Sequence, residues 1–265
     1  MIEGIHCTWE EFKAEAAQLR QAAPSFSPML FRGQSNASWD LETTLERSGH
    51  GETVSEYYHL ILRIKAEAEV ATNNKWADLP FIPEIDVLAR DYDEFSRALS
   101  NLPHYAYMAY LRHHSFPSPL LDWSNSPYVA AYFAFRTETG PEQEVAIFAY
   151  TERTGSLKIS SSEHPQIHRL GPYVNAHKRH FSQQSEYTVC VHFLNGRWTF
   201  VQHSNVFDSS PEGREQDVLK KFVIKATERK AVLRELSDYN LNAYTLFGSE
   251  EGLMESLSNR EEIRD

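Results

Sequence analysis

The stretch SNSPYVAAYFAF, residues 124–135, combines a strong helix start with an almost wholly apolar helix. Ser126 is of a type favoured at the N-cap, and Pro127 is of the type favoured at the first helical position, so a helix is predicted to begin there. The residues from Tyr128 to Phe135 offer no polar face, and a helix that is apolar on all sides is buried. We therefore expect this helix to lie in the core of the fold.

Strand-like segments follow the helix in the second half of the chain. Short runs rich in β-branched and aromatic residues predict four strands. They are EVAIFAY (144–150), YTVCVHF (187–193), RWTFVQ (197–202) and LKKFVIKA (219–226). Asn195-Gly196, between the second and the third of them, predicts a tight hairpin turn.

Helical signals dominate the first half of the chain and return at its end. Thr8, followed three residues later by Glu11, predicts a capping box at a helix start. A short strand is predicted at 29–34, and further helices at 52–71, 92–98, 103–113, 228–238 and 250–257. The predicted fold class is α+β, with a mainly antiparallel sheet and flanking helices. We expect a single domain, residues 1–265, with a helical segment, about 50–115, inserted between the first strand and the sheet.

The composition is that of a globular chain. Of 265 residues, 41% are hydrophobic and 12% aromatic, and a net charge of −11 without a long Lys/Arg run argues against a broad face for duplex nucleic acid. Cys7 and Cys190 suggest neither a disulfide framework nor a zinc site. No apolar segment is long enough to cross a bilayer, and the first residues lack a signal-peptide pattern, so the cytoplasm is the expected location.

Arg32 stands where the short predicted strand gives way to a polar turn. A guanidinium group can hold a phosphate or diphosphate through two parallel hydrogen bonds, and Gly33 would let a ligand approach the backbone closely. Gln34 and the two polar residues after it add donors. The alternative is a buried salt bridge from Arg32 to Asp122 or Glu42, and the sequence leaves both possibilities open.

The segment LLDWS, residues 120–124, lies immediately before the buried helix. Asp122 beside Trp123 can form the polar floor of a pocket, in which Ser124 could hydrogen-bond a ribose. The alternative is that Asp122 only caps the loop, while Ser126 caps the helix that follows.

A third polar segment is HFSQQSEYTVCV, residues 180–191. Ser182, Gln184 and Glu186 alternate along a stretch predicted to be extended, so they are expected to face one side and the residues between them the other. Gln184 and Glu186 could then hold a sugar hydroxyl and polarise a neighbouring group. The alternative is a solvent-facing entry to the strand.

The chain contains three motif blocks: FRGQ followed by SWDLETTLER (31–47), YLRHHSFPSPLLDWSNSPYVAAYFAF (110–135) and LRELSDYNLNAYTLFGSEEGL (233–253). In this order they resemble the FRG-domain family of bacterial and phage proteins, which is named after its Phe-Arg-Gly motif. The resemblance places His114 beside the LLDW loop, where it could orient Asp122 or carry a proton. The family has been described by its motif alone, so it implies no single activity.

The same polar residues also resemble the ordered Arg, Ser and Glu of ADP-ribosyltransferases. This resemblance implies that NAD is a substrate, with its diphosphate on Arg32, its nicotinamide ribose on Ser124, and Glu186 supporting a cationic transition state. The residues expected around NAD are Arg32, Gly33, Gln34, His114, Asp122, Trp123, Ser124, Gln184 and Tyr187, and those expected to be catalytic are Arg32 and Glu186.

The chemistry that these residues could perform is cleavage of the bond to nicotinamide, in which a nearby carboxylate stabilises the positive ribose. We therefore expect an NAD-dependent ADP-ribosyltransferase or NAD glycohydrolase, acting as a toxin or in phage defence, with a protein or nucleic acid as acceptor. No metal and no membrane are expected to be involved. The alternative is a non-enzymatic module that senses a nucleotide or binds a protein.

Overall fold

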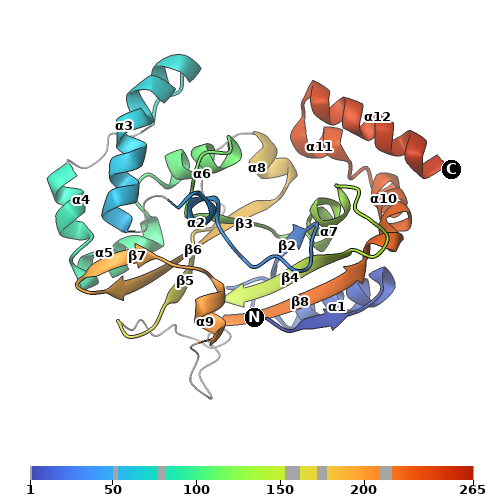
Figure 1. Ribbon diagram of the computed structural model, residues 1–265, viewed down its shortest axis with the longest axis horizontal. Helices are drawn as coiled ribbons and strands as arrows, with labels where there is room; N and C mark the ends of the chain where they lie inside the picture. The colour runs from blue at the N-terminus through green and yellow to red at the C-terminus, as the bar shows by residue number, and fades with distance from the viewer. Residues whose placement is uncertain are drawn as a thin grey trace.

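The computed structural model describes residues 2–49, 53–76, 82–152, 162–171, 178–208 and 217–264. Its described strands form one eight-stranded sheet in the order β1-β8-β4-β2-β3-β6-β5, with β7 paired to β6 (Figure 1). All the neighbouring strands are antiparallel except β1 and β8, which are parallel. The strands are β1 (Gly4–His6), β2 (Leu30–Gln34), β3 (Leu121–Ser124), β4 (Glu144–Glu152), β5 (Gln166–Arg169), β6 (Ser185–Leu194), β7 (Arg197–Phe200) and β8 (Asp217–Lys225). The predicted α+β class and mainly antiparallel sheet are confirmed.

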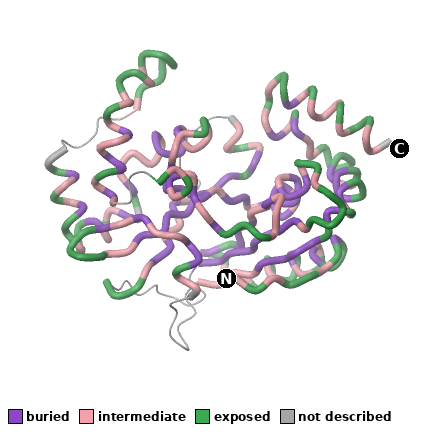
Figure 2. Tube along the Cα trace, viewed as in Figure 1, coloured by how far each residue is buried: buried purple, intermediate pink, exposed green. Residues whose placement is uncertain are grey.

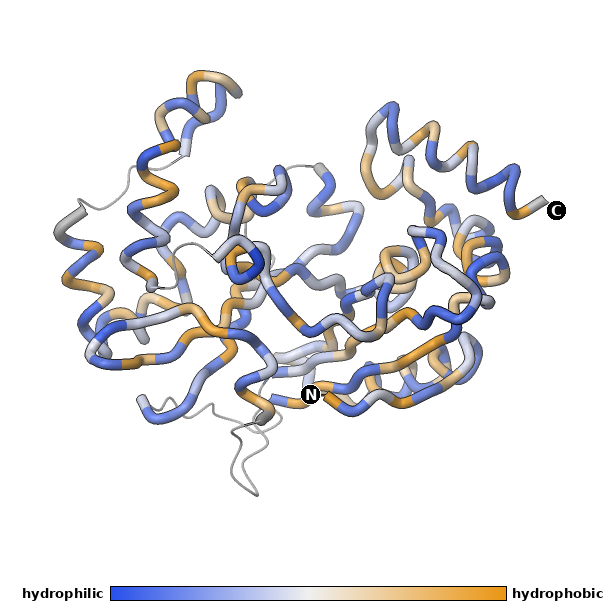
Figure 3. The backbone as a smooth tube through the Cα atoms, in the orientation of Figure 1, coloured by the Kyte–Doolittle hydropathy of each residue, from blue (hydrophilic) through white to orange (hydrophobic). Residues whose placement is uncertain are grey.

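Strands β2, β4 and β8 carry the first core. Gly33, Ile147 and Phe222 are partners across these strands, and because side chains alternate, their register turns one apolar face toward the helices. The helices that pack there are α1 (Trp9–Ala22), α7 (Pro127–Phe135) and α10 (Arg229–Asp238). Hydrophobic residues colour most of α7 in Figure 3, and seven of its nine residues are buried, as its sequence predicts.

A second core lies over β6 and β7, where purple, buried segments converge in Figure 2. It contains large aromatic side chains such as Tyr57, Tyr107, Tyr187 and Trp198. Its helices connect β2 to β3 along the chain: α2 (Thr44–Ser48), α3 (Val54–Thr72), α4 (Ile82–Leu88), α5 (Tyr92–Ala98) and α6 (Tyr105–His113). The other helices are α8 (Lys178–Ser182), α9 (Ser204–Asp208), α11 (Ala243–Phe247) and α12 (Glu250–Arg264). Within the described ranges, no helix has the length and apolar character needed to span a bilayer.

The local signals for caps and the hairpin are confirmed. Thr8 Oγ1 accepts a hydrogen bond from the backbone N–H of Glu11 at 3.3 Å, while the Glu11 carboxylate accepts from the N–H of Thr8 at 2.7 Å. Ser126 Oγ accepts from the N–H of Val129 at 3.3 Å. Asn195 and Gly196 both have positive φ, 52° and 74°, as a two-residue hairpin requires.

The prediction that residues 182 to 186 are extended is wrong. Ser182 is the last residue of α8, and β6 begins only at Ser185. Between them Gln184 adopts a left-handed conformation with φ of 48°, which interrupts the strand-like alternation. Ser182, Gln184 and Glu186 therefore do not form one face of a strand. The short strands β1, β3 and β5 were not predicted.

Gly33 is fixed by packing between β2 and α7. A Cβ atom at this position would overlap the carbonyl oxygen of Ala130 and come within 2.6 Å of the backbone nitrogen of Ala134. The helix backbone thus lies where a side chain would stand. Close packing of the helix on the strand therefore by itself requires a glycine at this position of the Phe-Arg-Gly motif.

Gly33→Ala is expected to destabilise the protein by about 3 kcal/mol or more, because backbone atoms of α7 must move to admit the methyl group. Gly140→Ala is the matched control, since its added Cβ would have its nearest neighbour, Gln143 Cγ, at 4.0 Å. Denaturant unfolding followed by circular dichroism measures both. Equal, small losses in the two variants would contradict the packing argument.

Candidate functional site

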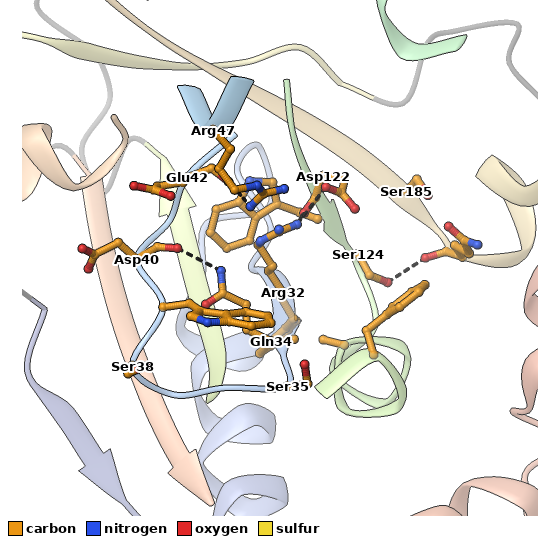
Figure 4. Close-up of a pocket in the computed structure, with 17 residues that line it drawn as sticks. Arg32, Gln34, Ser35, Ser38, Asp40, Glu42, Arg47, Asp122, Ser124 and Ser185 are labelled. Atoms are coloured by element: carbon orange, nitrogen blue, oxygen red, sulfur yellow. Dashed lines mark hydrogen bonds and ion pairs between the residues drawn. The ribbon is translucent and has the colours of Figure 1, made fainter. Parts of the chain in front are cut away.

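A cavity of about 710 Å³ lies beside the junction of β2 and β3 (Figure 4). These strands share a single register pair, Phe31 opposite Ser124, so they leave room for side chains between them. α7, the segment from Ser35 to Arg47, and Gln183 and Ser185 before and at the start of β6 form the other walls. The charged and amide groups that line the cavity are Arg32, Gln34, Asp40, Glu42, Arg47, Asp122 and Gln183.

Arg32 is paired with Asp122 across the gap between the two strands. Its Nη1 donates to Asp122 Oδ1 at 2.8 Å and to the Asp122 main-chain oxygen at 2.8 Å. Arg112, on α6, donates to the same Oδ1 through Nη2 at 2.6 Å and Nε at 3.2 Å. Of the two salt bridges that the sequence allowed, the one to Asp122 forms.

The two guanidinium groups fix the charge of the carboxylate between them. Burial alone would raise the pKa of Asp122, but Arg112 and then Arg32 outweigh burial and hold this pKa far below its usual range. Burial lowers the pKa of Arg32, an effect that Asp122 opposes. Asp122 raises the pKa of Arg112. The cluster of two arginines and one aspartate therefore carries one positive charge in excess.

Arg32 keeps one edge of its guanidinium group unpaired. Arg112 and Arg136 present their Nε and Nη2 edges to a carboxylate, whereas Arg32 uses only Nη1. The Nε of Arg32 is buried and donates to no described residue. Gln34, two residues along the strand, donates Nε2 to the main-chain oxygen of Asp40 at 3.1 Å, while its buried Oε1 accepts from no described residue. An unpaired donor and an unpaired acceptor thus lie on the same face of β2.

Aromatic side chains form part of the cavity wall. Trp39 is 54% exposed although it is a large apolar residue. Phe133, from α7, is half-buried. Trp123 is buried, and its Nε1 donates to Thr188 Oγ1 at 2.8 Å. Trp39 is therefore the aromatic ring of this wall with the most surface available for stacking.

Ser124 lines the cavity, but its hydroxyl group already has two partners. Its Oγ donates to the main-chain oxygen of Gln183 at 2.8 Å and accepts from the N–H of Ser126 at 3.0 Å. These bonds join the end of β3 to the segment before β6 and to the start of α7. Ser124 therefore shapes the cavity by holding its walls together.

Glu186 does not line this cavity. Ser185 is the register partner of Ser124 and does line it, while the next residue, Glu186, pairs with Trp123 and points to the other face of β6. Glu186 is 1% exposed and forms an ion pair with Arg169, whose Nη2 lies 2.5 Å from Oε2. Arg32, Ser124 and Glu186 were expected to line one cavity. Arg32 and Ser124 do so, and Glu186 does not.

Three further residues expected around NAD also lie away from the cavity. Tyr187 is fully buried, and its hydroxyl group is 2.6 Å from Nε2 of His113. His114 is exposed at the end of α6, with its ring 4.3 Å from that of Tyr110. Gln184 is exposed in the left-handed turn before β6. Gln183 and Ser185 are the members of this segment that border the cavity.

Two arginines of the site were missed in the sequence. Arg112 follows the buried Met108 by four residues, which places both on the inward face of α6. Arg47 reaches the cavity from α2, whose start carries the capping box formed by Thr43 and Glu46. The sequence contains a signal for each of them: the four-residue helical spacing from Met108 to Arg112, and the Thr-x-x-Glu pattern of Thr43 and Glu46 at the start of the helix that carries Arg47.

Asp122→Asn is expected to destabilise the protein at pH 7 by about 1–3 kcal/mol, because two arginines lose their counter-charge. This expected loss of stability is smaller than the loss caused by breaking a fully buried ion pair, because the Asp122 side chain is 43% exposed. The folded-state pKa of Asp122 is depressed, so its charge stabilises the fold fully above the unfolded pKa of about 4, and this stabilisation is lost progressively as pH falls from there toward the folded-state pKa. The difference from wild type should shrink in acid. Denaturant titrations across this range measure it, with the exposed Glu67→Gln as control, and a difference independent of pH would contradict the charge argument.

Comparison with known proteins identifies one family. The model of the FRG domain matches residues 27–143, which include Arg32, Arg47, Arg112 and Asp122. No curated protein and no solved structure matches the chain. The match ends before β6, so Gln183 and Ser185 border the cavity from outside the matched range. Residues 27–143 of this chain are thus similar to the FRG domain.

Proposed function

We propose that the cavity binds a nucleotide of the NAD class. The observation that carries this proposal is the unpaired Nε and Nη2 edge of Arg32, next to the unpaired Oε1 of Gln34, in a cavity of about 710 Å³. Pockets of that size commonly hold small organic ligands, and polar groups at a few fixed positions orient them. A ligand that carries both an anionic oxygen and a hydroxyl group would accept hydrogen bonds from the free edge of Arg32 and donate one to Oε1 of Gln34.

The assignment of ligand groups follows from the chemistry of the lining. The free edge of a guanidinium group binds a phosphate through two parallel hydrogen bonds. Gln34 Oε1 can accept from a ribose hydroxyl. Trp39, 54% exposed, offers a face for stacking a base. Asp122, held between Arg32 and Arg112, keeps the phosphate-binding group in position without neutralising the cluster.

Binding without turnover is the form of the proposal that the geometry supports best. A reaction that releases nicotinamide needs a carboxylate near the ribose. Glu186 is buried against Arg169, so it is engaged elsewhere. NAD consumption, by hydrolysis or by transfer to a protein or nucleic acid, is the second candidate, and the observation in its favour is that Asp40 and Glu42 line the cavity. A toxin or phage-defence role would follow from such consumption.

Isothermal titration of the wild-type protein with NAD is expected to show one site. Arg32→Lys retains a positive charge beside Asp122 but removes the Nε and Nη2 edge, so affinity should fall at least about tenfold. Arg63→Lys, the same substitution on the exposed side of α3, controls for the change of residue type and should bind as wild type does.

Glu186→Gln tests whether NAD binding depends on Glu186, the third of the residues that the sequence suggested would bind NAD. It keeps the shape of the side chain but removes the charge opposite Arg169, so it should lower stability while leaving the affinity for NAD unchanged. Absence of binding by the folded wild-type protein, to NAD and to other adenine nucleotides, would overturn the proposal.

The second candidate predicts release of nicotinamide from NAD, measured by chromatography. If the cavity consumes NAD, Glu42→Gln should lower the rate about a hundredfold or more, because it removes the carboxylate that supports the cationic ribose. Asp238→Asn, an exposed substitution at the end of α10, is the control. Binding of NAD without release of nicotinamide would contradict NAD consumption and leave nucleotide sensing as the remaining function.

A further inference from the structure

Arg47 is the second guanidinium group of the cavity, and it forms no ion pair with a carboxylate of the described chain. Its Nη1 donates one hydrogen bond, to the main-chain oxygen of Glu42 at 3.3 Å. Arg112 and Arg136 differ, since each of them is held by a carboxylate through two nitrogen atoms. The side chain of Arg47 is therefore available to a ligand.

Arg47 and Arg32 approach the cavity from different elements. Arg32 projects from β2 and Arg47 from α2, and Figure 4 shows both of them on the cavity wall. The charge of Arg47 contributes to lowering the pKa of Arg32, so the two groups are close enough to repel each other. An anion bound between the two guanidinium groups would be attracted by both of them and would relieve their mutual repulsion.

We propose that Arg47 binds the second phosphate of a diphosphate whose first phosphate is held by Arg32, so that the cavity selects nucleoside diphosphates over monophosphates. This inference rests on the proposed nucleotide function and adds to it a residue that determines specificity. Each phosphate oxygen is an acceptor for a guanidinium N–H, and such charge-assisted bonds are the strong ones.

Because carboxylates lie among the arginines of the cavity, the preference for a diphosphate depends on where the negative charges of the ligand lie. Asp122 is shared by Arg32 and Arg112. Glu42 Oε1 accepts a hydrogen bond from Nε2 of Gln202 at 3.2 Å. Since negative groups lie beside positive ones, the cavity has no broad positive field that would attract any polyanion. A ligand is therefore favoured when its anionic groups match the positions of the two arginines.

The test is titration of wild type and Arg47→Gln with adenosine, AMP, ADP and ADP-ribose at one fixed ionic strength. Wild type is expected to bind ADP and ADP-ribose about tenfold more tightly than AMP. In Arg47→Gln this preference should disappear, while the affinity for AMP stays within about twofold of the wild-type value. Arg63→Gln, on the exposed side of α3, should keep the preference.

The outcomes separate this inference from the function on which it rests. Equal binding of AMP and ADP by wild type would overturn the role of Arg47 and leave nucleotide binding intact. An equal loss of AMP and ADP affinity in Arg47→Gln would also overturn it, because the arginine would then act on the whole site. Failure of the wild type to bind any of the four ligands would overturn both proposals.

Discussion

The ion cluster of Arg32, Asp122 and Arg112 joins three parts of the fold at a point where the sheet is weakly paired. Strands β2 and β3 share one register pair, Phe31 with Ser124. Arg32 spans the junction with hydrogen bonds to both the side chain and the main chain of Asp122. Arg112 brings α6 to the same carboxylate. The cavity owes its position to this junction, because a continuous ladder there would leave no space for a ligand.

The three residues of the Phe-Arg-Gly motif serve two structural purposes, packing against α7 and lining the cavity. Phe31 is fully buried in the core under α7. Gly33 lies on the same face of β2 and lets the backbone of α7 approach closely. Arg32, between them, points the other way and lines the cavity. The alternation of a strand thus explains why an apolar residue, a cation and a glycine stand side by side.

Much of the fold was predictable because its signals are local. The capping boxes, the Ser126-Pro127 helix start and the Asn195-Gly196 turn depend on residues within four positions of each other. β3 was missed because Asp122 and Ser124 make half of a four-residue strand polar. Such a strand is specified by its neighbours in the sheet and not by its own composition.

The site was predictable in its residue types and less so in its geometry. Arg32, Gln34, Asp122 and Ser124 were identified, but the sequence could not choose between a ligand and a salt bridge for Arg32, because both use the same group. Gln184 adopts a left-handed conformation, and its two neighbours, Gln183 and Ser185, border the cavity in place of Gln184 and Glu186. Backbone conformation at a single non-glycine position is not encoded in the alternation of polar residues.

The bonds between Arg32 and Asp122 join residues 90 positions apart in the chain. All of the helices from α2 to α6 lie in the loop that these bonds close. Closing a loop of that length is entropically costly until the intervening helices have become compact. Closure of the junction between β2 and β3, and with it formation of the cavity, is therefore expected to follow the compaction of these helices.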